Sequence, residues 1–184
     1  MLKTFFSAHP FQEFADLQLK AIEADIAVAS AADLASPAFV NTLKTKHELR
    51  PIALDLAAAR DDVKEGPSGT TVVHFVIPFT GPSVLLRIRP TQMLLSIPQG
   101  DLTGARPGSD IDGHITLFYE ARGADADNYK QWKASEVERL QKWIGFLNDD
   151  VTNYYGTMCR TIERCIAARL QRLRELDSFK QAIQ

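Results

Sequence analysis

The sequence is short of cysteine, with only Cys159 and Cys165 among its 184 residues. Both fall in a segment with helical periodicity, where their spacing separates them by about 9 Å along the helix axis. A disulfide requires Cα atoms about 4.4 to 6.8 Å apart. The sequence therefore predicts two free thiols in a reducing compartment and excludes a fold held together by disulfides.

Long apolar runs and an excess of one charge are also missing. No stretch reaches the roughly 18 uninterrupted apolar residues of a membrane span, and the N-terminal MLKTFFSAHP is not a secretory signal. The 21 Lys and Arg residues are balanced by 23 Asp and Glu residues, which excludes the strong positive field of an obligate nucleic-acid binder. We therefore expect a globular cytoplasmic protein with no membrane contact.

Motifs for catalysis, metal binding and cofactor binding are absent as well. The four histidines are scattered, without the H-x-x-x-H or H-E-x-x-H spacing of a metal site. No serine lies in G-x-S-x-G, and Cys159 has no evident histidine partner. Thr80-Gly81-Pro82-Ser83 lacks the spaced glycines and the Lys-Ser/Thr of a nucleotide loop, so a plain strand connection is favoured over ligand binding. We predict no catalytic residue, no metal and no cofactor in this chain.

The sequence does contain the periodicities of an α+β fold. Apolar spacing predicts a helix after Pro10, and Ser36 followed by Pro37 predicts the start of a second helix, which Pro51 ends. A short strand is expected within residues 52–56. Alternating apolar residues predict a central strand over 70–79, covered on both faces, and further strands over 84–89, 93–97 and 114–121, while residues 101–113 are expected to form a surface loop. The predicted fold is thus N-terminal helices, a small mainly antiparallel sheet of about four or five strands, and a long C-terminal helix.

From Ala124 onward the apolar period changes from two to about three and a half, which divides the chain into a globular part, 1–123, and a helical part, 124–184. A straight helix over Ala124 to Leu176 would be about 80 Å long. It must project, fold back as a hairpin near residues 153–156, or pair with a partner. The unbroken heptads favour one helix and a homodimer. The predicted dimer interface consists of Val137, Leu140, Ile144, Leu147, Val151, Tyr154 and Met158.

Arginines form two local clusters that could contact phosphates. One is a pair of arginines that project from one face of the strand predicted over 84–89, and the other follows the C-terminal helix. A solvated or salt-bridged helix face is the competing interpretation, because cations are favoured at helix C-termini in any case. The candidate nucleic-acid-binding residues are Arg87, Arg89, Arg160, Arg164, Arg169 and Arg172.

Three ordered motifs carry a family resemblance: Ile77-Pro78-Phe79-Thr80-Gly81, Arg89-Pro90-Thr91 and Ala168-Arg169-Leu170-Gln171-Arg172-Leu173. With the helix between them, they resemble a family of uncharacterised bacterial proteins in which this region often precedes a restriction-endonuclease-like domain. The resemblance covers roughly the last 110 residues. It implies an N-terminal accessory module of a nuclease in bacterial genome defence. The given sequence stops at Gln184 without a recognisable nuclease core. We therefore expect either a truncated chain or a family member that stands alone.

We therefore expect a non-enzymatic assembly or regulatory module that homodimerises and acts through protein–protein interaction, with an effector nuclease domain as a partner. The alternative is a nucleic-acid-binding module that uses the six arginines. A small-ligand pocket between the sheet and the helices is a third hypothesis.

Overall fold

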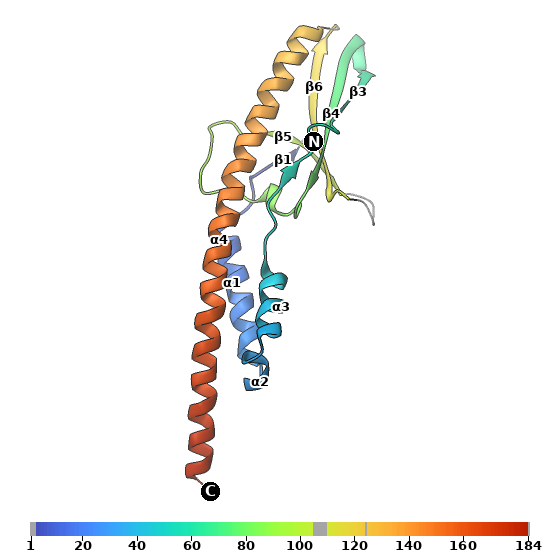
Figure 1. Cartoon of the computed structure of the whole chain (residues 1–184). Coiled ribbons are helices and arrows are strands. Elements are labelled where there is room, and N and C mark those ends of the chain that lie inside the picture. Colours follow the sequence, from blue (N-terminus) through green and yellow to red (C-terminus); the bar gives the residue numbers. More distant parts are fainter. Residues whose placement is uncertain (1–2, 105–109, 124, 184) are drawn as a thin grey trace. The chain divides into compact units, whose positions relative to one another are not determined.

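The structure is a computed structural model that describes residues 3–104, 110–123 and 125–183 (Figure 1). It confirms the α+β class, with N-terminal helices, a small antiparallel sheet and a long C-terminal helix. The chain divides into two compact units. Unit 1 comprises Met1–Phe11 and Arg50–Asp150, and unit 2 comprises Gln12–Leu49 and Val151–Gln184. This division differs from the predicted boundary at residue 123, because the N-terminal helices belong with the second half of the C-terminal helix.

Unit 1 is built on an antiparallel sheet in the order β1-β5-β6-β4-β2, with β3 also pairing with β4. The two longest strands form its centre and pair along ten residues of register, from Thr70 opposite Arg122 to Phe79 opposite Gly113. The strands are β1 (Lys3–Thr4), β2 (Ala53–Leu54), β3 (Arg60–Glu65), β4 (Thr70–Thr80), β5 (Gln99–Gly104) and β6 (Gly113–Arg122).

The alternation predicted for the central strand is observed in β4. Val73, Phe75, Ile77 and Phe79 are buried on one face, while most of the side chains between them are half-buried. Because β4 has partners on both sides, its apolar content matches a strand in the middle of a sheet. The short strand expected within 52–56 is β2, and the strand expected over 114–121 is β6.

Two other predicted strands are wrong. Residues 84–89 contain a 3-10 helix, Leu85–Arg87, whose Leu85 N–H donates to the carbonyl of Pro82 at 3.0 Å. Residues 93–97 form no strand. The fifth strand, β5, begins at Gln99 and runs into the region expected to be a loop, which starts at residue 101. The physical reason is that Leu85 and Leu86 are both fully buried, so consecutive apolar residues here mark a tight turn inside the core and not the two faces of a strand. The rest of the expected loop includes residues 105–109, which lie outside the described residues.

The turn after β4 is held by structural contacts. Gly81 has φ +106°, a conformation that favours glycine, and a Cβ there would lie 2.6 Å from the carbonyl oxygen of Pro51. Its N–H donates to the Asp112 carboxylate at 2.7 Å. A phosphate would need that N–H and would meet the negative charge of Asp112, so the geometry favours the plain strand connection.

The first half of α4 (Ala126–Ala182) lies along the sheet in unit 1 (Figure 1). The buried Trp143 stacks on Phe6 with ring centroids 5.2 Å apart, and its indole N–H donates to the carbonyl of Ser96 at 3.0 Å. Asn148 uses its amide to accept from the N–H and donate to the carbonyl of Ile52, both at 2.9 Å. The helix therefore binds loop backbone through side chains at its buried face.

Unit 2 contains α1 (Phe11–Val28), α2 (Ala31–Leu34), α3 (Pro37–His47) and the second half of α4 (Figure 1). The first residue of α1, Phe11, belongs to unit 1. The two predicted N-terminal helices are α1 and α3. Pro37 occupies the first turn of α3 as predicted, and Ser36 is its N-cap in extended conformation, without a side-chain hydrogen bond. The short α2 was not predicted and begins with a capping box between Ser30 and Asp33.

Helix α4 is a single α-helix of 57 residues that runs through both units. The predicted continuity is therefore observed, and the alternative hairpin near residues 153–156 is not. The predicted start at Ala124 lies outside the described residues.

Candidate functional site

The predicted dimer interface is largely covered by the chain itself. Val137 is half-buried, and the other six predicted residues are buried, namely Leu140, Ile144, Leu147, Val151, Tyr154 and Met158. The heptad pattern correctly marks the buried face of α4, but that face packs within the molecule. These six side chains offer no surface to a second copy in this conformation.

Arg87 and Arg89 are exposed in unit 1, but they do not project from a strand face as predicted. Arg87 ends the 3-10 helix, and its carbonyl accepts from the N–H of Ala8 at 2.8 Å. Arg89 pairs through its backbone with His9 and Phe11. The local backbone is therefore fixed by the N-terminal segment, while both arginine residues are exposed.

The other four predicted arginines, Arg160, Arg164, Arg169 and Arg172, lie on α4 in unit 2. They therefore share one helix, which Arg87 and Arg89 do not. Arg164 approaches Glu23 at 3.7 Å, and Arg172 approaches Glu175 at 3.4 Å. Arg160 donates to the hydroxyl of Thr157 at 3.2 Å. Arg169 is half-buried, and its Nε is shielded from solvent without a hydrogen-bond partner among the described residues.

The distal segment of α4, defined here as residues 163–183, is the part of the helix with the least cover. Burial along α4 ends at Ile162, and none of the residues 163–183 is buried. Leu176, Phe179 and Ile183 leave 36%, 64% and 67% of their surface exposed. Contiguous exposed apolar side chains mark interaction surfaces, and these three lie within two turns of one helix. The sequence does indicate this surface, because apolar residues continue along the predicted helix after Met158. The predicted dimer interface ends at Met158 and does not include them.

The distal segment is also basic. It contains five basic and three acidic residues, although the whole chain has two more acidic than basic residues. Two of the three acidic side chains are engaged within the helix, since Glu175 contacts Arg172 and Asp177 contacts Lys180 at 3.6 Å. The surface therefore combines exposed apolar side chains with a local excess of positive charge.

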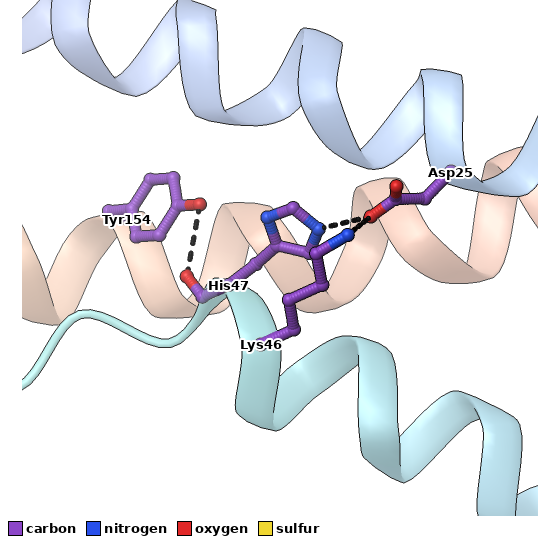
Figure 2. Close-up of polar contacts among 4 residues, drawn as sticks. All are labelled: Asp25, Lys46, His47 and Tyr154. Carbon is purple, nitrogen blue, oxygen red and sulfur yellow. Dashed lines mark hydrogen bonds and ion pairs between the residues drawn. The ribbon is translucent and has the colours of Figure 1, made fainter.

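A polar cluster in unit 2 joins α1, α3 and α4 (Figure 2). The Asp25 carboxylate accepts from Lys46 at 2.6 Å and from Nε2 of His47 at 2.8 Å, and His47 is only 5% exposed. The hydrogen bond from Lys46, joined by that from His47, holds the pKa of Asp25 below its usual value. Burial raises the pKa of Tyr154 to about 12, and its hydroxyl donates to the carbonyl of His47 at 3.3 Å.

This cluster has the composition of a His–Asp pair but not the surroundings of a catalytic one. A nucleophile would have to lie within hydrogen-bond distance of the imidazole, and no such contact is present among the described residues. The Asp25 carboxylate is shared with Lys46, which stabilises it as an ion pair. The arrangement is that of a structural link between helices.

A second polar cluster links β3 to the start of α4 in unit 1. The Tyr129 hydroxyl donates to the Asp61 carboxylate, and Lys133 donates to both carboxylate oxygens at 2.9 Å. Burial acts to raise the pKa of Asp61, but the hydrogen bonds from Tyr129 and Lys133 outweigh it and the pKa is lowered. Burial and the neighbouring Asp61 raise the pKa of Tyr129. Since every charged atom in this cluster is paired, it ties the edge of the sheet to the helix.

A cleft of about 440 Å³ lies in unit 1. It is lined in part by the rings of Phe118 and Trp132 and by the ion pair between Glu136 and Arg139, whose charged atoms are 2.7 Å apart. The ion pair already satisfies the charges that a polar ligand would use. The cleft therefore does not by itself indicate a ligand.

Comparison with known proteins adds no assignment, since no family model, curated protein or solved structure matches this chain. The family resemblance thus stays a prediction. Within residues 3–104, 110–123 and 125–183, no group of three or more metal-ligating side chains converges on one point. No helix in the same ranges is long and apolar enough to cross a membrane.

Proposed function

We propose that this chain is a non-enzymatic assembly or regulatory module that binds another protein through the distal segment of α4. The observation that carries the proposal is the contrast along one helix. Buried residues recur from Leu140 to Ile162, and then the apolar row continues through Leu176, Phe179 and Ile183 without cover. Exposed apolar surface on a helix that continues beyond its own core is stabilised by contact with a second helix.

The partner in this proposal is a second copy of the chain or an effector protein in the same cell. The family resemblance favours a nuclease effector in a bacterial defence system and a cytoplasmic location. A second copy would bind through the distal segment, because the predicted interface further up the helix is already buried.

Site-specific photo-crosslinking in the native host tests the proposal. A photoreactive residue at position 179 is expected to yield a defined protein adduct, either a cross-linked dimer or a complex with one other protein. The control is the same residue at position 95, where Leu95 is equally apolar and fully exposed in unit 1. The proposal is contradicted if position 179 yields no adduct beyond those formed from position 95.

Nucleic-acid binding is a second candidate, favoured by the four predicted arginines that have no carboxylate partner among the described residues, namely Arg87, Arg89, Arg160 and Arg169. Fluorescence anisotropy with labelled single- and double-stranded DNA tests it. Phosphate contacts predict an affinity that falls steeply as the salt concentration rises. A double variant with Arg87→Ala and Arg89→Ala should weaken binding if these residues take part, and absence of binding at low salt would exclude this function.

A further inference from the structure

We propose that the partner of the distal segment is an acidic amphipathic helix from another protein, and not a second copy of this chain. This inference rests on the proposed function, because it takes the distal segment as a binding surface. It goes further by stating the chemistry that the partner must have.

The inference starts from the face that the distal segment presents. Residues spaced alternately by three and four share one side of a helix, as in the a and d positions of a coiled coil. From Ile166 onward this face is formed by Ile166, Arg169, Leu173, Leu176, Lys180 and Ile183. Its first three residues are half-buried and its last three are exposed. It therefore contains four apolar side chains, two cations and no anion. It extends over about 26 Å of helix.

The two cations disfavour pairing with a second copy. In a parallel pair with matched register, Arg169 would face the same arginine of the other copy, and Lys180 would face the same lysine. In an antiparallel pair that matches Leu173 with Leu176, Arg169 would face Lys180. Juxtaposed like charges in a desolvated interface are strongly unfavourable. Both of these self-pairings therefore place positive charge against positive charge.

Carboxylates of a partner that flank its facing positions would remove this conflict. Lys180 is paired with Asp177 only at 3.6 Å, between exposed side chains. Arg169 has an Nε that is shielded from solvent and lacks a hydrogen-bond partner among the described residues. A carboxylate from a second helix would give the Arg169 guanidinium the ion-pair partner that it lacks among the described residues.

The exposed apolar residues of the distal segment favour a protein over a nucleic acid as its partner. Phosphates would contact the arginines but would leave Leu176 and Ile183, and Phe179 beside this face, in water. A helix with leucine-like residues at its own a and d positions covers them, and glutamate or aspartate beside those positions meets Arg169 and Lys180. The face thus fits an amphipathic helix with acidic residues along its apolar row.

A synthetic peptide of about three heptads tests the inference against the full chain. The probe has Leu at its a and d positions, with Glu at the positions that flank them, and a fluorescent label. Its matched control has Lys in place of every Glu. Fluorescence anisotropy is expected to show saturable binding of the acidic peptide, at least tenfold tighter than that of the basic peptide and weaker at high salt.

Charge reversal in the chain gives the second arm of the experiment. The double variant with Arg169→Glu and Lys180→Glu is expected to prefer the basic peptide over the acidic one. No residue of the distal segment is buried, so the two substitutions should not disturb the core. Circular dichroism of the double variant should therefore show the same helical content as that of the native chain. Equal binding of the two peptides, or no change of preference in the variant, would overturn the inference.

Two further measurements separate failure of this inference from failure of the proposed function. Light scattering that shows a dimer, lost on Leu176→Ser and Phe179→Ser, would overturn the acidic partner but leave the distal segment as an assembly surface. Salt-dependent DNA binding with no peptide binding would overturn the inference in favour of nucleic acid. No peptide binding, no dimer and no adduct at position 179 would overturn both.

Discussion

At the residue scale, the two glycines Gly81 and Gly145 show how differently the backbone uses the same residue. Gly81 has a positive φ and packs against the backbone at Pro51, whereas a Cβ at Gly145 in α4 would meet nothing within 4 Å. The first glycine is required by the turn after β4. The second only removes a side chain from a helix.

Replacing each glycine by alanine should therefore change stability in opposite directions. Gly81→Ala is expected to lower the free energy of unfolding by about 2 kcal/mol, because a left-handed conformation costs about 1–2 kcal/mol for a residue with a Cβ and the added carbon overlaps a carbonyl oxygen. Gly145→Ala should raise it by about 0.5–1 kcal/mol through helix propensity. Urea denaturation followed by circular dichroism measures both, and equal effects would contradict this reading of the turn.

Single residues also show what the sequence could and could not reveal. The heptads correctly identified Leu140, Ile144 and Leu147 as one face of a helix, because periodicity follows from backbone geometry alone. They could not show that this face packs inside the chain, because a heptad is the same whether its cover is the chain itself or a second copy. The Asn148 contacts with Ile52 were missed for a related reason, since an isolated asparagine gives no signal of which distant backbone it will bind.

At the element scale, the helices were predicted well and two strands were not. The helices have strong local signals, such as Pro37 in the first turn of α3 and the sustained apolar period of α4. Residues 84–89 alternate like a strand, but Pro82 starts a tight 3-10 turn that buries two consecutive leucines. The tertiary contacts that bury Leu85 and Leu86 here override the local preference for a strand that the alternation indicates.

The link between α1 and α3 predicts a pH dependence of stability. The pKa of Asp25 is lowered in the folded chain, so its ion pair contributes stability above the ordinary carboxylate pKa of about 3.9 and loses it as the pH falls through the lowered value. Asp25→Asn should therefore reduce the free energy of unfolding at pH 7 by about 0.2–1 kcal/mol, the range for partly exposed pairs.

Comparison of urea denaturation at pH 7 and at pH 2 to 3 checks this. The difference between the native chain and Asp25→Asn should shrink at the lower pH, because Asp25 becomes protonated as the pH falls through its lowered pKa. The control Asp149→Asn removes an exposed carboxylate from α4 and should show little difference at either pH. A penalty for Asp25→Asn that persists unchanged in acid would contradict the ion-pair explanation.

At the scale of the whole molecule, α4 contributes a long stretch to each of the two units. Its early residues are fixed in unit 1 by Trp143 and Asn148, and Tyr154 contributes to unit 2. The sequence predicted the long helix but placed the domain boundary at its start, because a change of period is visible locally. The actual division cuts through the helix, and it depends on contacts between α4 and segments that are distant in the sequence.

The change of burial at Ile162 predicts a matching change in hydrogen exchange along α4. Amides of residues 140–158 are expected to exchange only on large-scale unfolding, because their turns carry buried side chains in each unit. Amides of residues 166–183 should exchange at least tenfold faster in a dilute sample, because the distal segment frays without any buried side chain to hold it.

Exchange followed by mass spectrometry, with and without a tenfold excess of the acidic peptide, measures both states. Addition of the peptide should slow exchange in residues 166–183 and leave residues 140–158 unchanged, whereas full protection of the distal segment in the dilute, peptide-free chain would show that it is already covered.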